Sequence, residues 1–562
     1  MRMSHKKQRY VGQTAPTRRE PNCPFMWRQF LVGAIAFGVA GCSAFTEEAP
    51  AIPKGTVGFV QGVIGGVATD EPRATLIARD ILAAGGSAAD AAVAAFFTMT
   101  VTLPSSVSLG GGGICLVRDH VTNTVETLDF RVKPSKANNF HPDAAAVPGS
   151  PRGVFALHAK YGSLKWEELI RPAENLARFG TEVSRALGQD LKVSLADIWL
   201  NPDLRDLFSA PDSDGPFKEG EFIKQVNLST TLALIRSKGA SELYLGPFAR
   251  QLAEDAQATG MAFTYDELRS YLPEWRKTIT VPFIQGTEFH FPAPPGLAGG
   301  TTALTTAMVA FRDLYENLDS IGRAHLLAEA IERSLADRPR WQNGNIEPEK
   351  IASLGEIERL MDNFDRTKHI PVPTQVSAPT DSLAKSRGAS ISVMDRNGSA
   401  VACSFTMNKP FGVGRVAKGT GMVLAAPPAT AEGEGGLASI MLVNKLGNSI
   451  FFAASATGGA AAPSALVNVM ANGIANADGD LETAMLSKRI HHGGADGTTY
   501  LEKGMNTAIV NGLGELGHKM AYVRTLGYVN AVFCSTGIPN KDGPNCAVRS
   551  DQRGFGLGVG SD

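Results

Sequence analysis

The stretch Arg387-Gly388-Ala389-Ser390-Ile391-Ser392-Val393-Met394-Asp395-Arg396-Asn397-Gly398 predicts the first strand and the turn of a β-hairpin. A second strand is expected from Ala400 to about Asn408. Because side chains alternate along a strand, each strand should present one face of small residues. These faces are Gly388, Ser390 and Ser392 on the first strand, and Ala402, Ser404, Thr406 and Asn408 on the second. From the hairpin alone, such a face is either a solvent-exposed side or the floor of a site.

The composition is that of a globular protein with a substantial core. The chain has 562 residues, of which 43% are hydrophobic and 19% are charged, and its net charge is -1. Nucleic-acid binding needs clustered Lys and Arg to neutralise phosphates, and no basic stripe follows residue 50. The sequence therefore predicts no nucleic-acid partner.

The N-terminus is typical of an export signal. An apolar run at residues 31–40 follows a basic leader, and its ten residues would rise only about 15 Å as a helix, too short to span a membrane. It ends in Val39-Ala40-Gly41-Cys42, which resembles the bacterial lipobox. Residues 1–42 are therefore interpreted as a lipoprotein signal peptide with a long leader, and residues 43–55 as a tether. The alternative is an ordinary signal peptide with an unrelated cysteine.

The lipobox interpretation implies a place in the cell. Acylation of Cys42 would anchor the protein in a membrane, and Ser43 after it resembles the signal for passage to the outer membrane. We therefore expect a periplasmic protein anchored to the outer membrane. Translation starting at Met26 instead of Met1 would shorten the leader to a usual length.

Four cysteines lie beyond the leader. Cys534 and Cys546 flank a turn-rich loop, residues 535–545, and could close it with a disulfide in an oxidising periplasm or remain as two thiols. Cys115 and Cys403 lie in apolar surroundings and are predicted to be inert core residues. Cysteines and histidines show no metal-ligand spacing, so neither a metal nor a cofactor is predicted.

Helix and loop signals alternate along the rest of the chain. Asp70 is the expected cap of a helix with Pro72 in its first turn, and Ser87 to Asp90 reads as a capping box for the next helix. The glycines at 110–113 precede a strand rather than a helix, which favours close backbone packing over a phosphate loop. Residues 340–387 lose periodicity and predict a long exposed loop.

Several separated motifs resemble γ-glutamyltransferases, also called glutathione hydrolases, which are N-terminal-nucleophile hydrolases. They are Gly85 to Ala94, Leu128-Asp129-Phe130-Arg131, Pro294-Pro295 with Gly299-Gly300, His325 to Arg338, Thr406-x-Asn408, Gly458-Gly459, Arg489-Ile490-His491-His492 and Ser550 to Gly554. The resemblance covers about residues 56–562. It implies an α+β fold, an αββα four-layer sandwich, in which residues 56–387 resemble the large subunit and 388–562 the small subunit of one composite domain.

The resemblance also assigns roles. In the family an internal threonine cuts its own chain and becomes the nucleophile, seven positions before the hairpin aspartate. Counting back from Asp395 reaches Gly388, which has no side-chain oxygen. The other matching positions are Thr406 and Asn408, which support the nucleophile and the substrate amino group, Gly458 and Gly459, which form the oxyanion hole, and Arg131 and Ser439, which bind substrate.

Further departures from the family fall on the substrate pocket. Val132 stands where the family has glutamate, Ala438 replaces one residue of a Ser-Ser pair, and residues 425–430 replace Asn-Asn-x-Met-Asp-Asp-Phe. The sequence therefore predicts an exported family member with impaired catalysis that retains a small γ-glutamyl or amino-acid-like ligand. Two alternatives stay open: an active amide hydrolase that uses a relocated serine, Ser386 or Ser390, and a structural envelope scaffold.

Acylation of Cys42 is directly testable. Mass spectrometry of the N-terminal peptide from membrane-extracted protein should show a diacylglyceryl adduct on this residue. Cys42→Ala should leave the protein unanchored. An unmodified mature N-terminus at another residue would contradict the lipobox interpretation.

Overall fold

The computed structural model describes residues 65–136, 144–210, 215–258, 263–378, 388–428, 436–475, 480–540 and 546–560. These residues belong to one compact unit, Ile52–Asp562. Cys42 and the tether at 43–55 lie outside the described residues. Within the described part of the chain, no helix is both long enough and apolar enough to cross a membrane.

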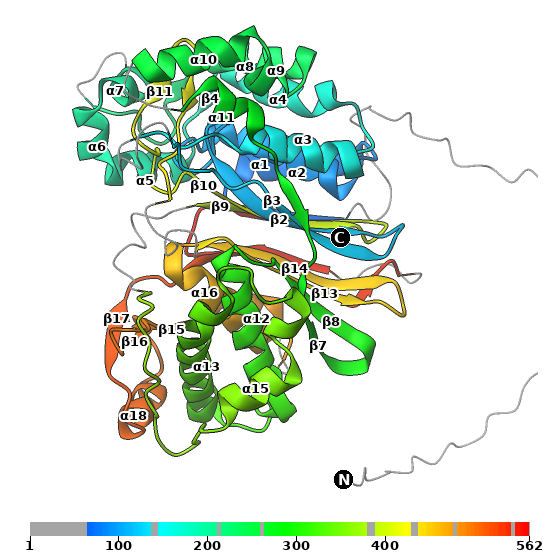
Figure 1. Cartoon of the computed structure of the whole chain (residues 1–562), viewed down its shortest axis with the longest axis vertical. Coiled ribbons are helices and arrows are strands. Elements are labelled where there is room, and N and C mark those ends of the chain that lie inside the picture. The colour runs from blue at the N-terminus through cyan, green and yellow to red at the C-terminus, as the bar shows by residue number, and fades with distance from the viewer. Residues whose placement is uncertain are drawn as a thin grey trace, which may run out of the picture. The chain divides into compact units, whose positions relative to one another are not determined.

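Two antiparallel sheets form the centre of the unit (Figure 1). The seven-stranded sheet has the order β20 (Leu557–Gly560), β1 (Gly65–Thr69), β9 (Ala389–Asp395), β10 (Ala400–Thr406), β2 (Gly112–Asp119), β3 (Thr124–Asp129) and β6 (Glu274–Arg276). The six-stranded sheet has the order β19 (Cys546–Ser550), β18 (Tyr528–Ile538), β14 (Ser449–Thr457), β13 (Ala438–Asn444), β8 (Thr287–Phe291) and β7 (Ile279–Pro282). Both sheets combine strands from the first and last parts of the chain.

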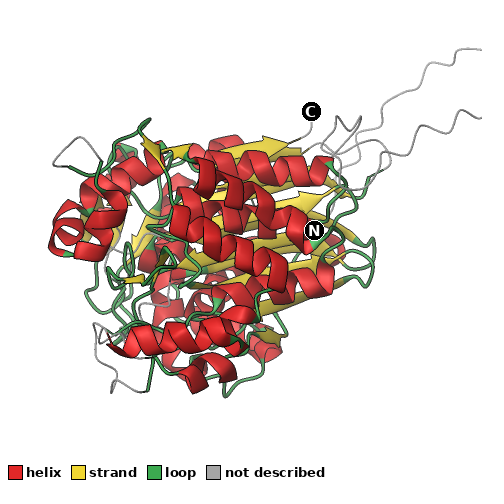
Figure 2. Ribbon diagram, turned by 90° about the horizontal axis from the view of Figure 1, so that it is seen from above, coloured by secondary structure: helices red, strands yellow, loops and turns green. Residues whose placement is uncertain are grey.

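Helices cover the outer face of each sheet, as Figures 1 and 2 show. On the seven-stranded sheet lie α1 (Pro72–Ala83), α2 (Ala88–Thr102) and α3 (Ser150–Tyr161), with α4 (Trp166–Phe179) and α8 (Val226–Lys238) outside them. On the six-stranded sheet lie α12 (Leu297–Ala310) and α16 (Ala462–Gly473), with α13 (Ser320–Trp341) packed against α12. This is the predicted αββα sandwich.

Shorter elements complete the unit. The helices are α5 (Arg185–Val193), α6 (Leu195–Leu200), α7 (Pro202–Phe208), α9 (Glu242–Leu245), α10 (Pro247–Ala258), α11 (Tyr265–Ser270), α14 (Pro348–Ile351), α15 (Leu354–Met361), α17 (Leu481–Leu486) and α18 (Thr507–Glu515). The strands are β4 (Thr181–Glu182), β5 (Phe222–Ile223), β11 (Val416–Ala417), β12 (Met422–Val423), β15 (Ile490–His492), β16 (Thr499–Glu502) and β17 (Met520–Val523). Because α14 and α15 lie inside 340–387, the prediction of one long loop there was wrong for this part.

The predicted hairpin is present, and its turn is bonded to α2. Strands β9 and β10 pair with Ala389 opposite Phe405 and Met394 opposite Ala400. The Asp395 carboxylate accepts hydrogen bonds from the backbone N–H groups of Asn397 (2.9 Å), Ser399 (3.0 Å) and Ala88 (3.1 Å). Burial raises the pKa of Asp395, although these N–H groups act in the opposite direction. The turn thus fixes the N-terminus of α2 against the sheet.

The predicted N-terminal cap is present at α2, whereas the predicted cap of α1 is wrong. Ser87 and Asp90 form the predicted capping box. The cap of α1 is Glu71, whose side chain accepts the N–H of Ala74 (2.9 Å), and not Asp70. Asp70 instead accepts a hydrogen bond from the N–H of Ser390 (2.7 Å), more than 300 residues away in the chain. Adjacent carboxylates compete for the cap, and tertiary structure decides between them.

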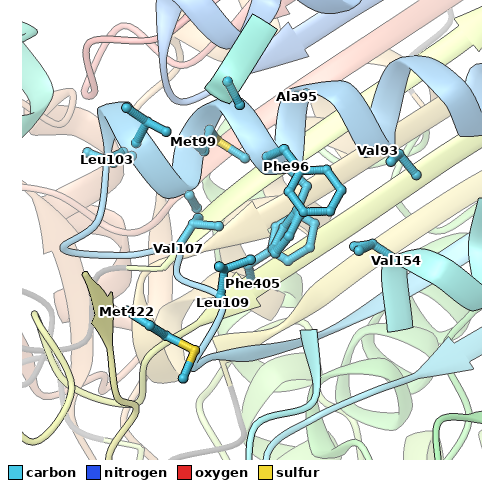
Figure 3. Close-up of a cluster of buried hydrophobic side chains, with 14 of the residues drawn as sticks. Val93, Ala95, Phe96, Met99, Leu103, Val107, Leu109, Val154, Phe405 and Met422 are labelled. Atoms are coloured by element: carbon cyan, nitrogen blue, oxygen red, sulfur yellow. The ribbon is translucent and has the colours of Figure 1, made fainter. Parts of the chain in front are cut away.

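The core behind β10 is formed by α2, which is buried along its whole length. Figure 3 shows Phe96 and Met99 of this helix close to Phe405 and Leu109. The Phe96 and Phe405 ring centroids are 5.3 Å apart. The glycine run before β2 allows the close packing that was predicted, since a Cβ on Gly112 would lie 2.4 Å from the backbone nitrogen of Val132.

Two disulfides join neighbouring strands. Cys534 and Cys546 are directly opposite on β18 and β19 and form the disulfide that was one of the two alternatives. Cys115 and Cys403 are also bonded, so their prediction as inert core thiols was wrong. The pairing of β2 with β10 places Cys115 opposite Cys403, although 288 residues separate them in the chain. Strand register, invisible in the local sequence, decides this bond.

Candidate functional site

Gly388, the predicted nucleophile position, is buried immediately before β9. A Cβ atom placed on it would lie 2.4 Å from the carbonyl oxygen of Phe405 and 3.2 Å from Cγ2 of Thr457. Real Cβ atoms do not approach a backbone oxygen this closely, so β9 or β10 would have to move to admit any side chain. The position therefore lacks both the hydroxyl and the room for one.

The polar faces of β9 and β10 are turned toward the second sheet and not toward solvent. Ser392 Oγ lies 2.7 Å from Ser455 Oγ and donates to the carbonyl oxygen of Asn530 (2.9 Å). Ser404 Oγ is 3.1 Å from the carbonyl oxygens of both Ala438 and Ala456. These side chains are buried. The alternative of a solvent-facing hairpin is therefore wrong, and most of this face is a bonded seam between the sheets.

Ser390, a candidate relocated nucleophile, belongs to the same buried face. Its Oγ lies 3.2 Å from Asp70 Oδ2, to which it donates, and accepts a hydrogen bond from Asn530 Nδ2 (2.8 Å). The residue has no exposed surface. These partners hold the hydroxyl inside the sandwich, where a substrate amide does not reach it. Ser386 lies outside the described residues.

Thr406 and Asn408 end β10 beside the nucleophile position. Thr406 Oγ1 accepts the N–H of Asn408 (2.8 Å), and Asn408 has a positive φ of 61°. Its side-chain Nδ2 donates to the carbonyl oxygen of Ala426 (2.7 Å). Ala426 belongs to the segment that departs from the family pattern. The amide expected to support a substrate is thus bonded to the protein's own backbone.

Gly458 and Gly459 lie directly after β14, where the chain turns toward α16. Their φ angles are 117° and 61°, which L side chains rarely adopt, so glycine is required at both. A Cβ on Gly458 would also lie 2.7 Å from Cα of Gly527. The two glycines adjoin Thr457, which contacts the Gly388 position, so the fold places the expected oxyanion hole next to the expected nucleophile.

Two buried hydroxyls at this end of the second sheet have no hydrogen-bond partner among the described residues. They belong to Ser439 on β13 and Thr457 on β14. Ser439 was a predicted binding residue, whereas Thr457 was not singled out. The only sequence signal for Thr457 is its place before Gly458-Gly459. A buried hydroxyl without a partner is unfavourable, because it loses its hydrogen bonds to water without replacing them.

Arg131 lies after β3 and is held by Asp129. Its Nε and Nη2 atoms donate to the two carboxylate oxygens of Asp129 at 3.0 and 2.8 Å, and Nη1 is 3.5 Å from the carbonyl oxygen of Pro295. Burial opposes ionisation of Asp129, but the hydrogen bonds and charge of Arg131 outweigh it and lower the pKa of this carboxyl. Asp129 thus orients the guanidinium and occupies one of its edges.

A cavity of about 150 Å³ surrounds Arg131. Its lining includes Asp129, Lys133, Tyr271, Glu274 and Arg276. None of the predicted catalytic positions is among the lining residues that the structure describes. A larger cavity, of about 850 Å³, lies near the β2–β3 turn and His290, among residues with no part in the predicted site.

Comparison with known proteins agrees with the resemblance found in the sequence. The family model described as Gamma-glutamyltranspeptidase matches residues 74–427, more than half of the chain. The chain belongs to the gamma-glutamyltranspeptidase family. It is 28% identical over 433 residues to the glutathione hydrolase proenzyme of Escherichia coli, covering 71% of this chain and 73% of the relative.

An acylase and a solved structure extend the comparison. The Acylase ACY 1 proenzyme of a Pseudomonas species is 28% identical over 390 residues, covering 64% of this chain and 68% of that protein. The crystal structure of cephalosporin acylase from Bacillus halodurans superposes with a TM-score of 0.74 at 20% identity, over 92% of this chain and all of that chain. The latter likeness supports the N-terminal-nucleophile hydrolase fold.

The missing room at Gly388 predicts a stability difference between two glycine variants. Gly388→Ala should lower the free energy of unfolding by about 1–3 kcal/mol, because its Cβ would overlap the Phe405 carbonyl. Gly355→Ala on α15, where a Cβ meets no atom within 4 Å, is the matched control and should be neutral or stabilising by up to about 1 kcal/mol. Denaturant midpoints measure both. A Gly388→Ala protein as stable as wild type would contradict the packing.

Proposed function

We propose that this chain is an exported lipoprotein of the gamma-glutamyltranspeptidase family with impaired catalysis, which binds a small γ-glutamyl or amino-acid-like carboxylate at Arg131. The carrying observation is Gly388, where the family's nucleophile oxygen is missing and the Phe405 carbonyl fills the place of a side chain. Acyl transfer in this family needs that oxygen to form the acyl-enzyme. Without it, the expected rate enhancement is largely lost.

The alternative of a relocated serine is less well supported. Ser390 is buried and bonded to Asp70 and Asn530, so a substrate would have to break both contacts and open the sandwich. A displacement of even 1 Å can cost about two orders of magnitude in rate. An active hydrolase that uses Ser386 or Ser390 is therefore the second candidate.

Ligand binding at Arg131 distinguishes the proposal from a structural scaffold. The guanidinium is partly buried and already oriented by Asp129, and the second cation Arg276 has its Nε 3.8 Å from Asp129 Oδ2. Three cations, Arg131, Lys133 and Arg276, line this cavity with two carboxylates, Asp129 and Glu274, and the excess of positive charge favours the approach of an additional anion. Since Asp129 occupies the Nε–Nη2 edge of Arg131, we expect the ligand carboxylate to bind weakly and not through a bidentate ion pair at this edge.

Export is supported by sequence and by disulfide content. Val39-Ala40-Gly41-Cys42 resembles a lipobox, and Cys115–Cys403 and Cys534–Cys546 are both bonded. Structural disulfides persist in oxidising compartments such as the bacterial periplasm. A periplasmic protein anchored to the outer membrane accounts for both features.

A chain without the nucleophile should remain one polypeptide. Self-cleavage needs a hydroxyl or thiol to attack the preceding carbonyl, and Gly388 has neither. Gel electrophoresis should show a single band, and γ-glutamyl-p-nitroanilide should not be hydrolysed above background. Two stable fragments that divide near residue 388 would contradict the proposal, and N-terminal sequencing of the smaller one would identify the true nucleophile.

Arg131 should carry the ligand site. Isothermal titration with glutamate and glutathione should show binding by the wild-type protein that Arg131→Ala abolishes. Arg185→Ala, which removes an exposed arginine paired with Glu219, is the control and should bind normally. Equal binding by wild type and Arg131→Ala, or none by wild type, would favour the scaffold interpretation instead.

A further inference from the structure

Six buried or nearly buried side chains, from α13 and the segments packed against it, form a histidine–glutamate cluster. Three of them, His325, Glu329 and Glu332, lie on that helix. The others are His369 from the connecting segment at residues 362–378, His492 at the end of β15, and His518 just before β17. Potential metal-ligand atoms lie within 4.8 Å of one another in two groups, His325–Glu329–His518 and Glu332–His369–His492. No sequence spacing revealed either group.

The first group is satisfied by its own hydrogen bonds. The carbonyl oxygen of Asp365 can only accept, so His325 Nε2, 2.8 Å away, must donate to it. His325 Nδ1 is hydrogen-bonded to His518 Nε2 (2.7 Å), and His518 Nδ1 is hydrogen-bonded to Thr499 Oγ1 (3.1 Å). Every ring nitrogen in this relay has a partner. A cation bound to this group would have to break these hydrogen bonds.

The second group leaves two atoms without a hydrogen-bond partner among the described residues. They are Glu332 Oε2 and His492 Nε2, on side chains that are 3% and 0% exposed. His492 Nε2 is 3.9 Å from Glu332 Oε1, and His369 Nδ1 is 3.9 Å from Glu332 Oε2. These separations are too long for hydrogen bonds. One ion with bonds of about 2.0–2.2 Å to each ligand can span about 4 Å, so a central cation fits them.

We propose that Glu332, His369 and His492 bind a divalent transition-metal ion of the zinc class. Two imidazoles and a carboxylate are a common ligand set for Zn²⁺ and unlike the all-oxygen sites of Ca²⁺ or Mg²⁺. Binding at His369 Nδ1 displaces the proton that this atom shares with Glu329, so the His369–Glu329 hydrogen bond is lost while Glu329 stays paired with Arg333.

Charge and protons are consistent with a bound cation. Arg333 pairs with Glu329 inside the protein, whereas the buried Glu332 carboxylate has the imidazoles of His369 and His492 at 3.9 Å, so a cation between the three would balance its charge. His492 Nδ1 accepts the N–H of Gly494 (3.2 Å), so the neutral ring carries its proton on Nε2. Metal binding at Nε2 shifts this proton to Nδ1 and releases the Gly494 hydrogen bond. The site thus exchanges two hydrogen bonds, those of Gly494 with His492 and of His369 with Glu329, for metal–ligand bonds.

The ion would fasten the connecting segment that leads toward Gly388. This segment already contacts the helix through the N–H of Val372, which donates to Glu332 Oε1 (3.2 Å), and contacts the strand region through the N–H of Ala378, which donates to the Gly493 carbonyl (2.9 Å). A metal held by Glu332, His369 and His492 would join α13, the segment and β15 through coordinate bonds. Its role is structural, and it is independent of the proposed ligand site.

Metal titration of the full-length, chelator-treated protein tests the site. One equivalent of Zn²⁺ should bind and raise the melting temperature, and Co²⁺ should give the visible absorption of a low-coordinate, nitrogen-ligated ion. Glu332→Gln and His492→Ala should each weaken Zn²⁺ binding by more than about 100-fold. Glu288→Gln removes a carboxylate beside another histidine, His290, at 3.0 Å, and is the matched control with unchanged affinity.

Two results would overturn the proposal. One is the absence of stoichiometric uptake of Zn²⁺, Co²⁺, Ni²⁺ or Mn²⁺ by wild type. The other is uptake that Glu332→Gln leaves intact, which would place the metal elsewhere. Glu332→Gln preserves the shape of the side chain and removes the carboxylate that would bind the metal. If His492→Ala fails to fold, the wild-type Co²⁺ spectrum and the Glu332→Gln titration still decide the question.

Discussion

The direct hydrogen-bonded contact between the two sheets is the constraint on which the site depends. Ser392 of β9 and Ser455 of β14 meet hydroxyl to hydroxyl, 2.7 Å apart, and Ser455 Oγ donates its single hydrogen either to Ser392 Oγ or to the Ile391 carbonyl oxygen at 3.0 Å. Only small side chains allow sheets to approach this closely, and buried hydroxyls must bond across the gap. The same contact brings the start of β9 onto the end of β14. Gly388 therefore touches Thr457, beside the Gly458-Gly459 turn.

The framework of the expected site is present, and two of its polar groups are hydrogen-bonded to the protein itself. Asn408 is bonded to the Ala426 carbonyl, and Arg131 is bonded to Asp129, so two groups with expected substrate roles are satisfied by the protein itself. Ser439 and Thr457 are the exceptions, with buried hydroxyls that no described residue satisfies. A fold can tolerate a few such groups when the surrounding packing is extensive. This pattern supports our proposal of impaired catalysis.

Cross-links of several kinds connect distant parts of the chain in this unit. The Cys115–Cys403 disulfide ties β2 to β10, and the buried Arg489–Asp551 pair (2.6 Å) ties β15 to the segment after β19. The histidine–glutamate cluster adds contacts among α13, the connecting segment and β15. Because the chain is continuous through Gly388 in our proposal, the connecting segment remains attached at both ends.

The sequence by itself determined the features that depend on neighbouring residues. The β9–β10 hairpin follows from the Asp395 to Gly398 turn, and the α2 cap follows from Ser87 and Asp90, because each signal acts over a few residues. The motif order was also sufficient for the αββα fold and for the location of Gly388, Thr406 and Gly458-Gly459.

Only the tertiary structure decided which residues meet across the chain. Asp70 bonds to Ser390, Cys115 pairs with Cys403, and His325 bonds to His518, and strand register and helix packing set each of these contacts over 193 residues or more. Local sequence carries no record of such distances, because a side chain's partner across a sheet or between helices depends on where the whole backbone has folded.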